Sequence, residues 1–342
     1  SFPFSRSPFK GQDWGKYRFR EKTARAYLDA LIREINLSSR PGKTASILLG
    51  AGDWSLVPSD YLIRIESCLK SKYPFAKSFE FTAEASPFNI AAASVEVLSQ
   101  TKINRVSLNL HKYPLENLEF TAALLRPLTK NINLDLYFGT PRQSLGDWRK
   151  TLRAVIFCKP THISIYSFGT TAQATGLRRQ MYFLALDSLK QKRYRQHDIY
   201  HFSRPGYASR QNAIYAGQEN WIGFGAGAVS AWGNLRLKNA GSPKGYIQKM
   251  NAGRGSVTSR RILTTAQKLE ENIHFSLSRP EGLSLTVLRK EFPRRFPALE
   301  QTFIPRLVRA GYLYKSKNRI RLTKEGFFIA DDLISKLIAQ LT

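Results

Sequence analysis

The order of apolar and polar residues in the first two thirds of the chain alternates between two periodicities. Short apolar runs predict buried strands at 45–49, 78–82, 105–110, 132–138 and 162–168. Apolar residues at helical spacing predict helices at 22–37, 60–72, 89–99, 115–128, 145–157 and 172–192. Strands separated by helices of this length predict a parallel sheet with right-handed crossovers. With a further strand expected near the N-terminus, this is an open or partial (β/α) barrel.

The pattern changes at about residue 256. Helical spacing predicts helices at 265–277, 284–292, 299–310 and 325–341, with extended pieces at 312–314 and 320–322. Helices combined with a hairpin of this kind predict a winged-helix-like module. We therefore predict the α/β class with two domains, the partial barrel with its extension at 1–255 and the module at 256–342.

The charge is the strongest compositional signal. The 342 residues hold 53 Lys and Arg against 25 Asp and Glu, for a net charge of +28. A positive field favours anionic partners such as nucleic acid, acidic lipid or a polycarboxylate such as a porphyrin. The charges are spread along the chain, however, so solubility explains them equally well. With no transmembrane run and no apolar leader, we expect a cytoplasmic or organelle-matrix protein.

The two cysteines, Cys68 and Cys158, lie in apolar, helical stretches far apart in the sequence. We interpret them as buried free thiols, because neither a disulfide framework nor a zinc site has this spacing. Two cysteines are also too few to hold a four-iron cluster that requires three protein thiolates.

Unusual residues follow the predicted strands, at the ends where barrels of this type carry out their chemistry. They are Gly50 to Asp53, Glu84, Asn109 to His111, Asp135 with Gly139, and Tyr166 with Ser167.

Four stretches of the chain resemble motifs of one known family. The first fourteen residues keep the frame H-I-P-F-C-x-x-x-C-x-Y-C-D-F, through Phe2-Pro3-Phe4 and Asp13-Trp14. Residues 131–144 match N-I-N-L-D-L-x-x-G-x-P-x-Q-S, residues 162–167 match H-I-S-x-Y-S, and residues 203–216 match A-R-P-G-Y-x-x-x-H-N-x-x-Y-W. The chain thus resembles the radical S-adenosylmethionine (SAM) family of oxygen-independent coproporphyrinogen III oxidase, which includes the haem chaperones. The resemblance runs to about residue 336.

The resemblance implies a SAM pocket in which some of the family's residues remain and others are replaced. The three cluster cysteines are Ser5, Phe9 and Gln12 here, and since thiolates hold such clusters, we expect no 4Fe-4S cluster. The positions implied for SAM that remain are Gly50, Gly52, Glu84, Ser107 and Asp135.

A second set of positions is implied for haem. The family's proposed haem-linked histidine is Gln211, whereas Asn212 and Tyr215 of the same motif remain. Glutamine is a poor axial ligand for iron. Among the remaining histidines, His201 beside Tyr200 is the best candidate for a porphyrin contact.

The leading hypothesis is therefore a non-catalytic protein of the radical SAM fold that binds haem, another anionic tetrapyrrole or a protein partner. One alternative is an active role in porphyrin or haem metabolism, as a coproporphyrinogen dehydrogenase-like enzyme or in haem transfer, with SAM or haem as cofactor. A second is a basic module that binds nucleic acid or a partner. The family carries a similar C-terminal module without a DNA-binding role, so nucleic acid is not the partner we expect.

Overall fold

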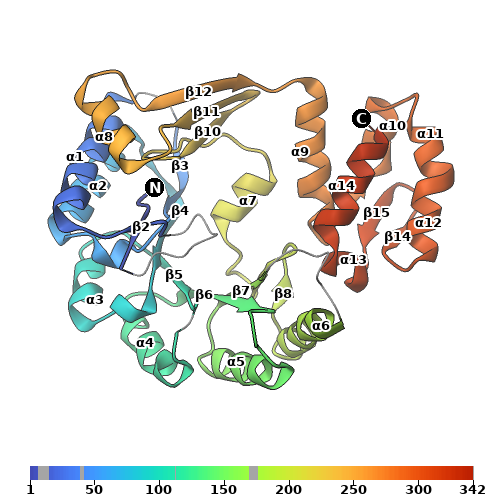
Figure 1. Cartoon of the computed structure of the whole chain (residues 1–342), viewed down its shortest axis with the longest axis horizontal. Helices are drawn as coiled ribbons and strands as arrows, with labels where there is room; N and C mark the ends of the chain where they lie inside the picture. The colour runs from blue at the N-terminus through green and yellow to red at the C-terminus, as the bar shows by residue number, and fades with distance from the viewer. Residues whose placement is uncertain (7–14, 39–41, 112, 169–175, 342) are drawn as a thin grey trace.

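The computed structural model describes residues 1–6, 15–38, 42–111, 113–168 and 176–341 (Figure 1). Its centre is a seven-stranded sheet in the order β3-β4-β5-β6-β7-β9-β8. The strands are β3 (Thr44–Leu49), β4 (Phe75–Ala85), β5 (Arg105–Asn109), β6 (Asn131–Phe138), β7 (His162–Ser167), β9 (His201–Ser203) and β8 (Arg195–Gln196). β3 to β7 run parallel, which confirms the predicted α/β sheet, and β9 and β8 pair antiparallel at its end.

The helices that connect the strands cover the outer side of this curved sheet in Figure 1. They are α1 (Glu21–Leu37), α2 (Ser59–Lys72), α3 (Ala92–Ser99), α4 (Leu118–Leu125), α5 (Leu145–Phe157) and α6 (Gly176–Gln191), with short 3₁₀ turns η1 (Trp54–Leu56), η2 (Pro87–Asn89) and η3 (Leu115–Asn117). Ser144 and Asp147 form a capping box that fixes the start of α5, where the sequence pattern predicts it. A short helix, α7 (Arg210–Ala216), lies on the other, inner side.

The N-terminal strand differs from the prediction. β1 (Phe4–Ser5) pairs only with β2 (Tyr17–Arg18), in a separate two-stranded sheet. The N-terminal segment is joined to the turn after β3, because the Phe2 N–H donates to the Gly50 carbonyl and the Asp53 N–H donates to the Phe4 carbonyl, both at 2.9 Å.

A second sheet lies in a region where the sequence pattern predicts no element. β10 (Val229–Trp232), β11 (Leu235–Asn239) and β12 (Val257–Ile262) pair antiparallel, and α8 (Pro243–Asn251) connects the last two. All six residues of β12 are exposed, so it carries no apolar pattern. β12 follows the predicted domain boundary but pairs with β11, which precedes it.

The C-terminal module is helical with a small sheet, in agreement with the winged-helix-like prediction. It contains α9 (Thr265–Leu277), β13 (Leu283–Ser284), α10 (Leu285–Glu291), α11 (Phe296–Ala298), η5 (Leu299–Phe303), α12 (Ile304–Arg309), β14 (Leu313–Lys315), β15 (Arg319–Leu322), α13 (Lys324–Phe328) and α14 (Ala330–Leu341).

Two predicted helices of the module are divided. The segment predicted as one helix at 299–310 begins as the π-helix η5, since Pro305 has no N–H for a regular helical bond. The segment predicted as a helix at 325–341 breaks at Ile329, between α13 and α14.

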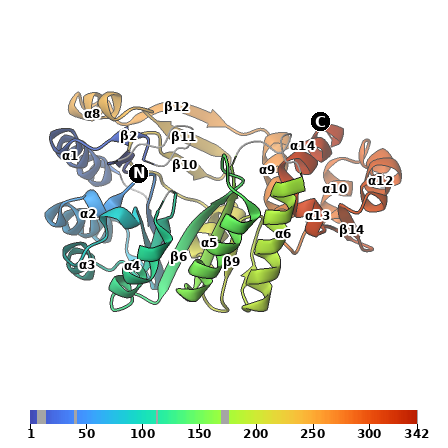
Figure 2. The same ribbon diagram turned by 60° about the horizontal axis from the view of Figure 1, so that its bottom comes forward.

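The module packs beside α6 (Figure 2). Arg179 of α6 pairs with Glu325, and Lys324 approaches Asp187 to 2.8 Å. The Phe328 ring lies 5.7 Å from that of Tyr182. Across the part of the chain that the structure describes, no helix is long and apolar enough to span a bilayer.

Candidate functional site

The parallel strands carry apolar side chains on one face and polar side chains on the other. Phe81, Val106, Leu134 and Ile163 are buried under the helices. The alternate positions hold Glu80 and Glu84 on β4, Arg105, Ser107 and Asn109 on β5, Asn133, Asp135 and Tyr137 on β6, and His162, Ser164 and Tyr166 on β7. Because neighbouring side chains of a strand point to opposite faces, these polar groups share the inner face. Parallel strands are more often apolar on both faces, so a polar inner face indicates a site.

Asn133 lies at the centre of this face and orders its neighbours. Its amide donates to Ser107 Oγ at 2.7 Å and to Asp135 Oδ1 at 2.8 Å. Ser107 Oγ donates to the other oxygen of Asp135 at 3.0 Å, and Ser164 Oγ donates to Asn133 Oδ1 at 3.1 Å. Two of the predicted SAM-pocket residues, Ser107 and Asp135, therefore meet in one network.

Glu84 closes the turn that follows β3. It accepts a hydrogen bond from the Ala51 N–H at 3.0 Å, and a Cβ added at Gly50 would lie 3.2 Å from Glu84 Oε1. Burial, reinforced by the negative charge of Asp135, raises the pKa of Glu84 to about 7. Gly50 and Glu84 thus lie together through a contact between two parts of the chain.

Gly52 and Asp53 also hold the turn after β3 in place. A Cβ at Gly52 would lie only 2.1 Å from the Phe2 carbonyl oxygen, so this glycine permits close approach of the N-terminal segment. The fully buried Asp53 accepts from the Ser86 N–H at 3.1 Å and from Asn89 Nδ2 at 2.6 Å. Burial raises the pKa of Asp53. Asp53 therefore ties the turn after β3 to the turn after β4.

His201 lies at the other end of the inner face, on β9. Its Nδ1 is 2.8 Å from both carboxylate oxygens of Asp198, and its Nε2 is 3.4 Å from the Tyr166 hydroxyl. Burial opposes ionisation of Asp198, but its hydrogen bonds with His201 and nearby amides hold the pKa of Asp198 below its usual value. The rings of Tyr137, Tyr166 and Tyr200 follow one another at 5.6 and 5.4 Å.

Beneath this layer, buried charges attach α7 to the sheet. Glu80 accepts from Ser209 Oγ at 3.1 Å and from the amides of Arg210 and Gln211 at 3.0 and 3.2 Å. Arg105 lies 4.0 Å from Glu80. These contacts hold the N-terminus of α7 against β4.

Arg105 also reaches across β6 to His162 of β7. One of its guanidinium nitrogens lies 2.5 Å from His162 Nδ1. Burial, and then the charge of Arg105, keep the pKa of His162 well below its usual value, so this histidine stays neutral.

Asn212 and Tyr215 reach the inner side through α7. The Asn212 amide donates to Ser209 Oγ at 3.3 Å, as part of the helix cap. The Tyr215 ring lies 5.0 Å from that of Trp221. Burial, opposed by a bond with Gln211 and assisted by the charge of Glu84, raises the pKa of Tyr215.

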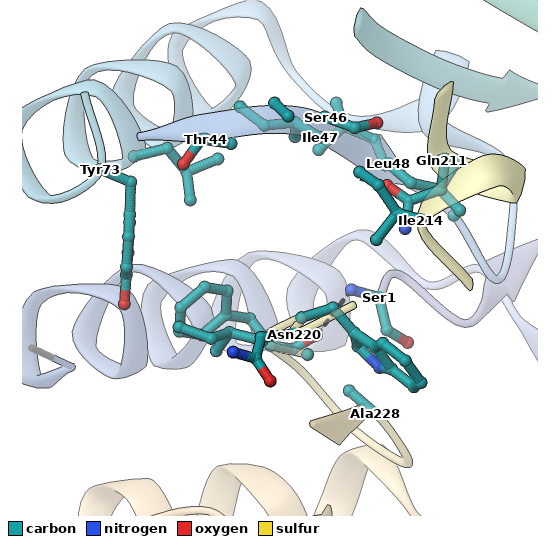
Figure 3. A pocket seen from close by; sticks show the side chains of 18 of the residues that line it. Ser1, Thr44, Ser46, Ile47, Leu48, Tyr73, Gln211, Ile214, Asn220 and Ala228 are labelled. Atoms are coloured by element: carbon teal, nitrogen blue, oxygen red, sulfur yellow. Dashed lines mark hydrogen bonds between the residues drawn. The ribbon is translucent and has the colours of Figure 1, made fainter. Parts of the chain in front are cut away.

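A cavity of about 490 Å³ runs along the free edge of β3 (Figure 3). β3 forms one wall, with Thr44, Ser46 and Leu48, and the segment 219–229 forms the opposite wall. Of the predicted site residues, Gly50 and Tyr215 line it, while Glu84, Ser107, Asp135 and His201 do not. The cavity therefore adjoins the inner face at its β3 end, where Ser46 and Leu48 pair with Glu80 and Thr82 of β4.

The cluster positions do not fit an iron–sulfur cluster. Ser5 is buried and its Oγ donates to the Gly15 carbonyl at 2.9 Å, while Phe9 and Gln12 lie outside the described residues. Cys68 is near the C-terminal end of α2 and Cys158 caps the end of α5. In a parallel sheet with crossover helices, the C-terminal ends of the helices lie at the opposite edge from the C-terminal ends of the strands. The donor set therefore supplies no thiolate at the site.

Within the ranges that the structure describes, no three His, Cys, Asp or Glu side chains gather as a metal site.

Reasoning from the sequence missed Glu80, Arg105, Asn133, His162 and Asp198. A signal for four of them was present, since every second residue is polar in E-F-T-A-E-A, R-V-S-L-N, N-I-N-L-D-L-Y and H-I-S-I-Y. Asp198 gives no such signal, because its role depends on the bend that places it beside His201.

Sequence comparison finds relatives along nearly the whole chain. The heme chaperone HemW of Lactococcus lactis is 23% identical over 95% of this chain and 93% of the relative. The Bacillus subtilis heme chaperone HemW is 23% identical over 96% and 95%. An oxygen-independent coproporphyrinogen III oxidase of Cereibacter sphaeroides is 22% identical over 84% and 72%. No family model matches the chain.

Structural comparison gives the same relationship. Coproporphyrinogen III oxidase (HemN) from Escherichia coli, a radical SAM enzyme, superposes with a TM-score of 0.83 over 98% of this chain and 88% of that chain, at 18% identity. The predicted radical SAM α/β fold is confirmed, and so is the resemblance, since the homologues of this chain are HemW haem chaperones and oxygen-independent coproporphyrinogen III oxidases.

Proposed function

We propose that this chain has a role in haem or porphyrin biology, and that it binds haem or a related anionic tetrapyrrole as cargo without radical SAM catalysis. The homologues carry the names haem chaperone and coproporphyrinogen III oxidase, which supports the general role. The observation that carries the specific proposal is the pairing of His201 with Asp198.

A histidine held in this way is suited to bind iron. Metal-binding histidines usually donate one ring N–H to a carboxylate, which fixes the ring and makes the other nitrogen more basic. Asp198 engages Nδ1 of His201, so Nε2 is the nitrogen available to a haem iron in exchange for its contact with Tyr166. Tyr166 and Tyr200 add flat, apolar surface for a macrocycle. The +28 charge favours a ligand with carboxylates.

The absence of catalysis is proposed from the donor set and from the closed turn. Radical SAM chemistry requires a cluster held by thiolates. The two cysteines lie at the C-terminal ends of α2 and α5, at the edge of the sheet opposite the site. The amide of Ala51, in the turn that the family uses for SAM, already donates to Glu84. Haem binding therefore relies on the His201 end of the face.

A haem titration tests the binding proposal. We expect the purified chain to give a saturable Soret shift, and His201→Ala to weaken haem binding about 100-fold through loss of the axial ligand. His274→Ala is the matched control, because His274 is an exposed histidine on α9, and it should bind as the wild type does. Equal binding by His201→Ala and the wild type would reject His201 as the ligand.

Reconstitution with iron and sulfide tests the second part. We expect no stoichiometric cluster and no cleavage of SAM. A cluster that cleaves SAM would instead support the alternative of an active enzyme in porphyrin metabolism, with Glu84, Ser107 and Asp135 as its retained SAM contacts.

A further inference from the structure

The C-terminal module contains a helix-turn-helix unit followed by a hairpin. Residues 292–295 connect α10 to the helical segment 296–309, formed by α11, η5 and α12, and the hairpin of β14 and β15 comes next. Two helices joined by a turn of this length are a common DNA-binding unit, in which the second helix enters a groove.

The fold concentrates positive charge on this unit. Residues 285–324 contain eleven basic side chains and two carboxylates, a much higher excess than in the rest of the chain. All eleven are exposed. They are Arg289, Lys290, Arg294, Arg295, Arg306, Arg309, Lys315, Lys317, Arg319, Arg321 and Lys324.

One of the two carboxylates joins the parts into a single surface. Glu300 of η5 lies 3.5 Å from Arg289 of α10 and 3.3 Å from Lys315 of β14. The other exposed residues of the second helix include Gln301, Thr302, Arg306 and Arg309. Arginine, glutamine and threonine are side chains that bind phosphates and base edges.

We propose that this surface, made of the segment 296–309 and the β14–β15 hairpin, binds double-stranded nucleic acid through its phosphate backbone. The excess of basic residues in 285–324 is present in the sequence, but the related proteins gave no reason to expect this partner. The tertiary structure favours it because it brings them together on a helix and a hairpin. The proposal is independent of haem binding at His201.

Fluorescence anisotropy with the full chain and a labelled DNA duplex of about 20 base pairs tests the proposal. We expect saturable binding in low salt that weakens steeply with added salt. Arg306→Ala/Arg309→Ala and Lys315→Ala/Lys317→Ala should each lower the slope of log K against log salt by about 2 and weaken binding roughly 50-fold near 0.1 M salt.

Arg149→Ala/Lys150→Ala is the control with the same loss of charge, since both residues are exposed on α5, away from the module. It should change the affinity less than about twofold. An equal loss in this control would overturn the proposal, because binding would then follow net charge alone. So would absence of binding at low salt, or tighter binding to anionic lipid vesicles that depends on the same four residues.

Discussion

The two ends of the inner face are built from similar polar residues but are engaged differently. At the β3–β4 end, the Ala51 N–H donates to Glu84 and Asp53 accepts from the Ser86 N–H. The Phe2 carbonyl packs directly against Gly52. At the β7–β9 end, Asp198 engages Nδ1 of His201, and the Tyr166 hydroxyl lies 3.4 Å from Nε2. The first end is stabilised as structure, whereas the second holds the histidine that we propose as the haem ligand.

The largest effect is expected from Gly52→Ala, at the closed end. The new Cβ would meet the Phe2 carbonyl at 2.1 Å and the Phe4 carbonyl at 2.7 Å, so the N-terminal segment must move. We expect the free energy of unfolding to fall by about 3 kcal/mol in urea denaturation.

Gly146→Ala is its control, because a Cβ at this position of α5 would approach only Ser144 Oγ, at 3.5 Å. It should leave stability unchanged or raise it slightly. A stable Gly52→Ala variant would show that the turn has room for a ligand after all.

A smaller effect is expected on the pH dependence of stability, through the protonation of Glu84. Its pKa is about 7 in the folded protein and about 4.5 when unfolded, so the folded state binds this proton more tightly. The resulting stability is present below pH 4.5 and is lost as the pH rises through 7. We expect the free energy of unfolding to fall by about 2 kcal/mol over this window.

Glu84→Gln should remove this fall, while Glu96→Gln, an exposed residue of α3, should keep it. Haem affinity should stay within about twofold of the wild type in Glu84→Gln, since the proposed ligand is at the other end. A large loss of haem binding in Glu84→Gln would show that both ends of the inner face belong to one haem site.

The smallest effect is expected from Tyr166→Phe. It removes the hydroxyl beside Nε2 of His201, so haem should bind about threefold more tightly in a Soret titration. Tyr137→Phe should leave haem affinity unchanged, because that hydroxyl bonds to Asn109. If Tyr166→Phe instead weakens binding as much as His201→Ala, the tyrosine is the iron ligand.

Several elements were predictable because their signals are local. The start of α5 follows its Ser144 cap, and strands such as β6 follow short apolar runs. β12 was not predictable, because exposed side chains carry no apolar period. The π-helix before Pro305 and the break at Ile329 were missed since both lie within helical periodicity.

The sequence by itself determined the fold, through strand and helix patterns and family motifs, and it determined the number of thiolates. The tertiary structure decided which groups meet, because the packing of α7 on the sheet and the antiparallel pairing of β9 with β7 bring together residues distant in sequence. Glu80 reaches Ser209, 129 positions away, and His201 reaches Tyr166, 35 positions away. It also decided that the basic residues of 285–324 share one surface, since the packing of the module exposes them on a helix and a hairpin.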